Sequence, residues 1–290
     1  MWIQPKYLAE PDSYLRRRDV IAAHATGVGA APADIDYLDE EHATWKTNMA
    51  LLGPAWEQNA ALPLLAARSV LQLPEDQIPQ LSLVSERLQG LSGYTYASVR
   101  DIVSRPEFFG ALAQTIFPST QYIRWAGSPL YTPAPDIMHE VSGHAISLAN
   151  EHLAELHRVL GEAGAATTSP ALLSEIASVF WYTAEFGVVR SRGGWKAYGA
   201  GLLSSPGELS WFADNAEIKP LSIAEMIATP YDITRYQPLL FGADSLEEVV
   251  DVARYFCSDI ADRADCSHDE LVVDLPNATL EESLKATHPE

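Results

Sequence analysis

Apolar residues recur every three or four positions along most of the chain, a period that predicts helices. Within residues 37–53, one helical face carries Leu38, His42, Trp45, Met49 and Leu52. The same period predicts further helices at 57–72, 75–91, 106–116, 136–162, 170–187 and 244–262. The predicted fold class is therefore mainly α with a few short β-strands.

The strand-like segments are short and lie between the predicted helices. They comprise residues 94–99 and 121–125, and Arg192-Gly193-Gly194 is typical of a hairpin turn. Prolines at positions 118, 129, 133 and 135 predict a loop after the 106–116 helix. No Pro- or Gly-rich linker divides the middle of the 290-residue chain, so a single domain is expected.

The two ends differ from this helical body. Residues 25–36 are rich in Gly and Ala, and we interpret them as a flexible lead-in with Asp34 as the N-cap of the first long helix. Beyond about residue 257 the chain is acidic and only weakly periodic, which predicts a tail.

Composition and charge narrow the function. The net charge is −20, and phosphate binding needs a concentrated positive surface, so no nucleic-acid partner is expected. No apolar run approaches the ~18–20 residues that cross a bilayer, and the first residues lack the pattern of a signal peptide. With only Cys257 and Cys266 as cysteines, we expect no disulfide framework, no membrane partner and a cytoplasmic location.

Two histidines at the start of an apolar helix form a candidate metal site. His139 and His144 lie five residues apart. Imidazole binds Zn, Cu, Fe and Ni, so the histidines alone do not name the metal. Five residues is roughly 140° around an ideal helix, so the rings converge only if the backbone bends, and Gly143 is the candidate for that bend.

A carboxylate completes the hypothesis. Glu185 lies in an apolar helical segment, where an unpaired carboxylate is costly to bury and a metal would offset that cost. Two His and one carboxylate are typical of non-haem iron(II) oxygenases, whereas a zinc hydrolase would use Glu140 as general base. The spacing alone is weak evidence, since His152 and His157 repeat it on what we expect to be a solvated face.

Several ordered blocks carry a family resemblance. Pro135 to His144 and Trp181-Tyr-Thr-Ala-Glu185-Phe-Gly187 resemble the pterin-dependent aromatic amino acid hydroxylases. Further matching blocks are Glu41-His-Ala-Thr-Trp45, Ile78-Pro-Gln-Leu81, Thr120-Gln-Tyr-Ile-Arg124, Tyr131-Thr-Pro-Ala-Pro-Asp136 and Tyr198-Gly-Ala-Gly-Leu-Leu-Ser-Ser205. The resemblance implies one catalytic domain at 35–256, preceded by a lead-in at 1–34 and followed by a tail at 257–290.

The resemblance also implies cofactors and site residues. Fe(II) would be held by His139, His144 and Glu185, and a tetrahydropterin, such as tetrahydrobiopterin or a bacterial equivalent, would share the activation of O₂. The implied pterin contacts are Phe108, by stacking, Glu140, and the segment Asp101, Ile102 and Val103. The implied substrate contacts are Arg124, Thr132, Pro135, Asp136, Trp181 and Ser204.

Individual roles follow from the same resemblance. Arg124 would bind the substrate carboxylate while Asp136 holds the guanidinium, although a surface ion pair is the alternative. Ser204 would hydrogen-bond an iron-bound histidine, with Phe180 near the iron.

The implied reaction is hydroxylation of the ring of a free aromatic amino acid. Trp181 favours L-phenylalanine, giving a para or meta product, over the tryptophan hydroxylase alternative, because it leaves less room for an indole. The chain departs from the family pattern at Phe180, Ala134, Val141, Ser142, Asp101 and Arg105, which leaves the ring position open. A monomer is expected, since no sustained heptad pattern is present. A zinc metallohydrolase and a non-catalytic binding module remain as alternatives.

Overall fold

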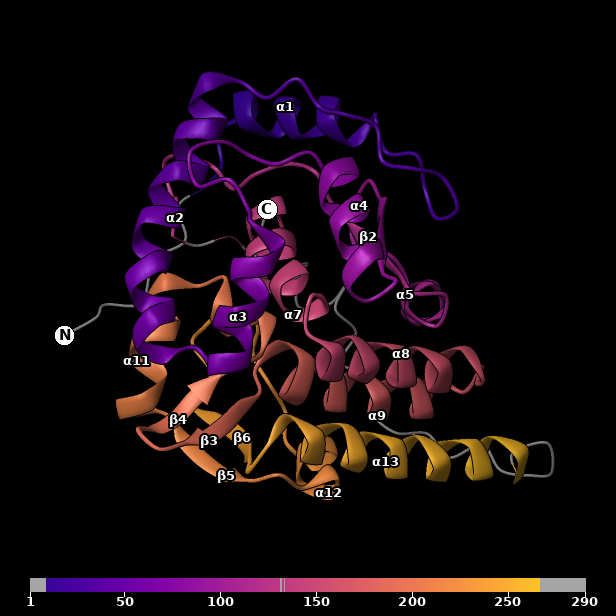
Figure 1. Cartoon of the computed structure of the whole chain (residues 1–290). Coiled ribbons are helices and arrows are strands. Elements are labelled where there is room, and N and C mark those ends of the chain that lie inside the picture. The colour runs from indigo at the N-terminus through magenta and orange to yellow at the C-terminus, as the bar shows by residue number, and fades with distance from the viewer. Residues whose placement is uncertain (1–8, 131, 133, 267–290) are drawn as a thin grey trace.

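The computed structural model describes residues 9–130, 132 and 134–266 (Figure 1). Helices make up most of it, and five of them lie before residue 113. These are α1 (Asp12–Ala22), α2 (Asp39–Asn59), α3 (Leu62–Leu71), α4 (Leu81–Leu91) and α5 (Arg105–Leu112). The predicted mainly helical class is confirmed.

The remaining helical segments begin at residue 137. In chain order these elements are α6 (Ile137–His139), η1 (Glu140–Ala145), α7 (Ile146–Leu148), α8 (Glu151–Ala165), α9 (Pro170–Phe180), η2 (Trp181–Glu185), α10 (Ala200–Leu203), α11 (Pro206–Asn215), α12 (Ile223–Ala228) and α13 (Leu246–Cys266). Helix α8 is central, because it packs against α5, α9 and α13 (Figure 1). No helix among the described residues is long and apolar enough to span a membrane.

Two small sheets complete the fold. Strands β1 (Thr95–Ser98) and β2 (Ile116–Ser119) pair in parallel, with Thr95 opposite Ile116. The second sheet has the order β4-β3-β6-β5, formed by β3 (Val188–Ser191), β4 (Gly194–Ala197), β5 (Glu217–Pro220) and β6 (Leu239–Ala243). The predicted hairpin at Arg192-Gly193-Gly194 is confirmed, since β3 and β4 are antiparallel around it.

Several predicted boundaries were wrong, each for a local reason. Residues 121–125 form no strand, because the strand lies earlier, at β2. The predicted 136–162 helix is interrupted before α8, where the Asn150 side chain accepts a hydrogen bond from the Leu153 amide at 3.2 Å. Asp34 is not an N-cap, since α2 begins at Asp39 and Asp34 instead accepts a hydrogen bond from Ser82 at 2.7 Å.

The structure also differs from the prediction at both ends of the domain, the lead-in at 1–34 and the tail from 257. Helix α1 lies within the expected lead-in, and position 257 falls inside α13, which packs against α8. The expected tail from 267 onward lies outside the described residues.

Candidate functional site

Three side chains from two distant segments converge in the interior. The Nε2 atom of His144 lies 3.0 Å from Oε1 of Glu185, and Nε2 of His139 lies 3.6 Å from Oε2 of the same carboxylate. One ligand atom from each of the three residues lies within 4.8 Å of the others. The predicted grouping of His139, His144 and Glu185 is therefore present in the fold.

Widened helical turns explain the convergence. His144 lies in η1 and Glu185 ends η2, and both segments are π-helical. A π turn closes an i→i+5 hydrogen bond, as the Phe186 amide does to the Trp181 carbonyl at 2.9 Å. Residues five apart then fall near one face, which brings His139 and His144 together. The bend predicted at Gly143 is thus a wider turn across the whole segment.

Gly143 has a different role from the one predicted. A Cβ atom placed there would lie 2.6 Å from the Ala200 carbonyl oxygen, so the glycine permits close approach of α10. Each π segment also contains a hydroxyl that donates to the carbonyl four residues earlier. Ser142 bonds Met138 and Thr183 bonds Val179, both at 2.6 Å. Such bonds bend helices, which suits a widened turn.

Hydrogen bonding directs His139 towards the group. Its Nδ1 atom lies 2.9 Å from Oγ of Ser204, and the Ser204 hydroxyl donates to the Gly201 carbonyl at 3.4 Å. In a neutral His139 whose Nε2 binds a metal, Nδ1 carries the ring proton, and Ser204 accepts it. The lone pair of Nε2 then faces Glu185. The predicted contact between Ser204 and a ligand histidine is present.

Burial keeps these imidazoles neutral. It lowers the pKa of His139 to about 4, with the Glu185 charge acting in the opposite direction, and it lowers the pKa of His144 to about 3. Burial raises the pKa of Glu185, and the two neighbouring histidines His139 and His157 oppose that shift. Neutral imidazole nitrogens and a carboxylate confined together are the donor set of a two-His, one-carboxylate metal centre. The residues present therefore fit a divalent metal ion.

A cavity of about 240 Å³ adjoins this group. Among the predicted site residues, those that line it are Asp101, Ile102, Val103, Phe108, Pro135, Glu140, Phe180, Trp181 and Glu185. The wall is thus mostly apolar and aromatic, with acidic groups at Asp101, Glu140 and Glu185 and a guanidinium at Arg105, which suits a flat heteroaromatic or aromatic guest.

Glu140 and Phe108 both line this wall. Burial and the nearby Glu185 charge raise the pKa of Glu140 well above its usual value, while the Thr120 amide donates to its carboxylate and opposes the shift. Phe108 is half-buried and packs edge-on against Phe180, with ring centroids 5.3 Å apart.

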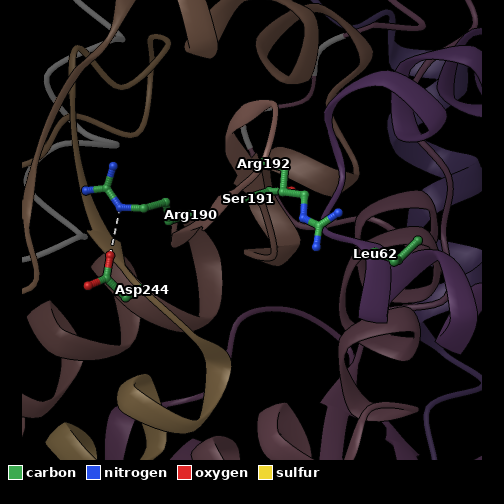
Figure 2. Close-up of a pocket in the computed structure, with 5 residues that line it drawn as sticks. All are labelled: Leu62, Arg190, Ser191, Arg192 and Asp244. Atoms are coloured by element: carbon green, nitrogen blue, oxygen red, sulfur yellow. Dashed lines mark hydrogen bonds and ion pairs between the residues drawn. The ribbon is translucent and has the colours of Figure 1, made fainter.

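A larger and more open depression of about 940 Å³ lies elsewhere (Figure 2). Its lining residues are Leu62, Arg190, Ser191, Arg192 and Asp244, and it shares none of them with the cavity beside Glu185. Arg190 points towards Asp244 and bonds it at 2.7 Å (Figure 2). Among the residues that the structure describes, this depression brings together no group of potential metal ligands, so we assign the function to the smaller cavity.

Arg124 and Asp136 form a buried pair, not a surface one. Nε of Arg124 donates to Asp136 at 2.9 Å and Nη2 at 2.8 Å, and the Arg124 amide adds a third bond at 2.6 Å. Burial opposes ionisation of Asp136, but Arg124 outweighs it and lowers the pKa of that carboxyl. Asp136 also caps α6 by accepting from the His139 amide at 3.1 Å, so it links the arginine to the first histidine.

Some predicted residues lie outside the cavity wall. Arg124, Asp136, Thr132 and Ser204 do not line it, and Thr132 donates its hydroxyl to the Ala134 carbonyl at 2.8 Å. Of the Arg124 guanidinium, only Nη1 has no hydrogen bond to the described residues.

The sequence analysis did not assign Tyr231 or His157 to the site. Tyr231 lines the cavity and stacks on Trp181, with ring centroids 4.3 Å apart and planes 13° apart. His157, expected on a solvated face, is instead fully buried, and its Nε2 lies 3.4 Å from Nδ1 of His144. That expectation was wrong because α8 is covered by α5 and α13, so this face of α8 is enclosed by protein.

Comparison with known proteins decides between the metalloenzyme classes. The family model described as biopterin-dependent aromatic amino acid hydroxylase matches residues 7–286. The chain belongs to this family. As a biopterin-dependent hydroxylase it is an oxidoreductase, and the zinc metallohydrolase and binding-module alternatives lose their support.

Individual relatives agree with this assignment. A phenylalanine 3-hydroxylase from Streptomyces coeruleorubidus is 43% identical over 248 residues, which cover 84% of this hydroxylase and 88% of that protein. Phenylalanine-4-hydroxylase from Bos taurus is 35% identical over 233 residues, or 78% of this chain and 51% of that protein. The chain thus spans about half the length of the bovine enzyme.

Solved structures share the fold. Phenylalanine hydroxylase from Chromobacterium violaceum with bound cobalt superimposes with a TM-score of 0.78 and 26% identity, covering 88% of this hydroxylase and 94% of that chain. The same protein with iron(III) and 7,8-dihydrobiopterin gives a TM-score of 0.77 at 26% identity, with the same coverage. The predicted aromatic amino acid hydroxylase fold is confirmed.

Proposed function

We propose that this hydroxylase converts free L-phenylalanine to its ring-hydroxylated product, with oxygen entering at position 3. The observation that carries the proposal is the 43% identity to a phenylalanine 3-hydroxylase along nearly the whole of both chains. Phe180 supports the ring position, because it lines the cavity beside Glu185 and brings no hydroxyl there. Trp181 supports phenylalanine over tryptophan, since its indole fills wall space that a larger substrate would need.

The proposed metal is Fe(II), held by His139, His144 and Glu185. Their donor atoms already face one another within 4.8 Å, and the imidazoles are neutral. Bound there, the iron would supply, together with a tetrahydropterin, the activation of O₂. Iron and dihydrobiopterin in the C. violaceum structure are consistent with this assignment.

The remaining residues position the two organic molecules. We assign the pterin to the side of the cavity formed by Phe108, Glu140 and the segment Asp101, Ile102 and Val103. A Glu140 carboxyl with a raised pKa can donate a hydrogen bond to a ring nitrogen or oxygen as well as accept one.

The amino acid would lie with its ring between Pro135 and Trp181. Its carboxylate would reach Nη1 of Arg124, the one guanidinium nitrogen that has no hydrogen bond among the described residues. Thr132, which lies three residues before Pro135 in the sequence, would be a second contact. The apolar wall keeps water from the ring, so the chain contributes orientation and a dry environment.

An aerobic assay tests the proposal. Fe(II)-loaded enzyme is incubated with tetrahydrobiopterin and, separately, phenylalanine, tyrosine and tryptophan, and products are resolved by mass and ring isomer. We expect meta-tyrosine from phenylalanine as the main product. Para-tyrosine would overturn the ring position alone, and hydroxytryptophan as the main product would favour the tryptophan alternative.

Glu185→Ala tests the metal assignment. Removing one of three ligands is expected to abolish iron retention and turnover, while circular dichroism shows the fold intact. Full iron content and activity in this variant would contradict the proposed ligand set. Glu86→Ala, at an exposed position of α4, is the matched control and should retain both.

A further inference from the structure

His157 on α8 contacts the candidate metal ligand His144 from behind. The two nitrogens of the His144 ring face opposite partners, because Nε2 lies 3.0 Å from Glu185 and Nδ1 lies 3.4 Å from Nε2 of His157. His157 is therefore on the far side of the ring from the point where the three ligand atoms converge. It cannot join them without displacing the His144 ring.

The proton positions along this contact follow from one backbone carbonyl. Nδ1 of His157 lies 2.7 Å from the carbonyl oxygen of Leu153. A carbonyl only accepts, so Nδ1 of His157 carries a proton, and in the neutral ring Nε2 is then an acceptor. It takes the Nδ1 proton of His144. The remaining nitrogen of His144, Nε2, is left with its lone pair on the side of Glu185, where a metal ion between the two would bind it.

We propose that His157 is a positioning residue that fixes His144 in the Nδ1-protonated tautomer and aims its Nε2 at the metal. This inference rests on the proposed metal centre. The relay from His144 through His157 to the Leu153 carbonyl matches the one from His139 through Ser204 to the Gly201 carbonyl. Each of the two ligand histidines is thus held by a series of hydrogen bonds that ends on a backbone carbonyl, which can only accept.

The surroundings of His157 argue against a packing role alone. Its ring is edge-on to Tyr94, Phe117 and Phe180, with centroids 5.4 to 6.5 Å apart. No carboxylate bonds it among the described residues. Burial of an imidazole among aromatic rings is energetically unfavourable unless its nitrogens are hydrogen-bonded, and both nitrogens of His157 are. Other buried positions on α8, such as Leu156 and Leu160, carry the apolar side chain that packing alone would favour.

Two variants separate the relay from packing. His157→Leu removes both nitrogens, whereas His157→Gln keeps an amide oxygen near the position of Nε2. Metal-free protein is examined by long-range ¹H–¹⁵N correlation of the imidazoles, which reports the tautomer of each ring. Cobalt(II) affinity is measured by titration, with the visible spectrum of the bound ion as a second readout. Thermal melting of the metal-free proteins reports any loss of packing.

We expect His157→Leu to lose the Nδ1-protonated form of His144 and to weaken cobalt binding by about 10- to 100-fold, the range typical for outer hydrogen-bond partners of metal ligands. His157→Gln should restore the tautomer and most of the affinity. The proposal is overturned if His157→Leu keeps both the tautomer and the affinity. It is equally overturned if both variants weaken binding alike, in step with their loss of thermal stability.

A further control distinguishes failure of this inference from failure of the proposed metal centre. If Glu185→Ala binds cobalt as tightly as the unaltered enzyme, the metal centre itself is wrong. The tautomer of His144 in the metal-free protein still tests the relay in that case, because it needs no metal.

Discussion

Trp181 is the single residue that most directly limits which ring the cavity admits. Its indole contacts both Tyr231 and Phe186, at centroid distances of 4.3 and 4.5 Å, so it has little freedom to move aside. Trp181→Phe should therefore enlarge the cavity and raise the ratio of kcat/KM for tryptophan over phenylalanine by about tenfold, the low end for one added or removed contact in an apolar pocket. Competition assays with both amino acids measure this ratio.

Trp195→Phe is the matched control for that change. Trp195 lies on β4, outside the cavity wall, and the same substitution there should leave the ratio unchanged. An unchanged ratio in Trp181→Phe would mean that another wall residue sets the preference.

Residue chemistry decided how much of the site the sequence could predict. His139, His144 and Glu185 were predictable, because ligand side chains in apolar helices need a reason to be there. Tyr231 was not, because it lies outside helices and strands and only tertiary packing brings it to Trp181. His157 was misjudged because the acidic residues beside it in sequence suggested a solvated face, while the covering helix α13 comes some ninety residues later.

At the scale of the element, the π turns are the feature on which ligand geometry depends. Thr183→Val keeps the shape of the side chain but removes the buried hydrogen bond to the Val179 carbonyl. We expect a loss of about 1 kcal/mol in the free energy of unfolding and weaker metal binding, since Glu185 is two residues away. Urea unfolding and metal titration measure the two effects.

Thr47→Val provides the comparison in a regular helix. Thr47 makes the same bond to the carbonyl four residues earlier, at 2.8 Å, but on an exposed face of α2. A change within about 0.5 kcal/mol is expected there. Equal effects in both variants would show that the π turn has no special need for its hydroxyl.

Element prediction succeeded where periodicity was long and failed where backbone geometry changed. The 3.6-residue period located the main helices, but it carries no information on a switch to i→i+5 bonding. The hydroxyl residues Ser142 and Thr183, inside otherwise apolar helices, were the sequence feature that could have indicated the π turns. Short elements such as α10, α12, β5 and β6 contain too few residues for a period to be read.

For the molecule as a whole, the buried acid Glu208 makes stability depend on pH. Burial raises the pKa of Glu208 to about 8, even though the Gln237 amide donates to it at 2.6 Å. The folded state therefore keeps a proton that the unfolded chain loses from about pH 4.5 upward, and the contribution of Glu208 to stability falls as the pH rises towards 8.

Glu208→Gln should remove this contribution. The free energy of unfolding of the variant relative to the unaltered enzyme is expected to rise between about pH 5.5 and pH 8, with a limiting slope of about 1.4 kcal/mol per pH unit. Urea unfolding across this range measures it. Parallel pH profiles for the two proteins would show that Glu208 ionises normally in the fold.

The helix α13 tests where the folded unit ends. Ile260 is fully buried on it, and Arg263 pairs with Glu175 of α9 at 2.7 Å, so residues beyond 257 pack with the body. Ile260→Ala should lower the free energy of unfolding by about 2–5 kcal/mol. Tyr255→Ala, on the 80% exposed face of the same helix, should change it by less than about 0.5 kcal/mol. If Ile260→Ala changed the free energy of unfolding as little as Tyr255→Ala, α13 would not be part of the cooperatively folded unit.

The widened turn in η1 can be related to the regular helical turn of another metal site by the insertion or deletion of one residue. Deleting Ser142 would leave His-Glu-Val-Gly-His, the HExxH spacing with which a regular α-helix presents two histidines to zinc. The ligand pair seen here is what a one-residue insertion into such a turn produces, provided that the turn widens to absorb it. A difference of one codon thus separates the ligand spacings of two classes of metalloenzyme.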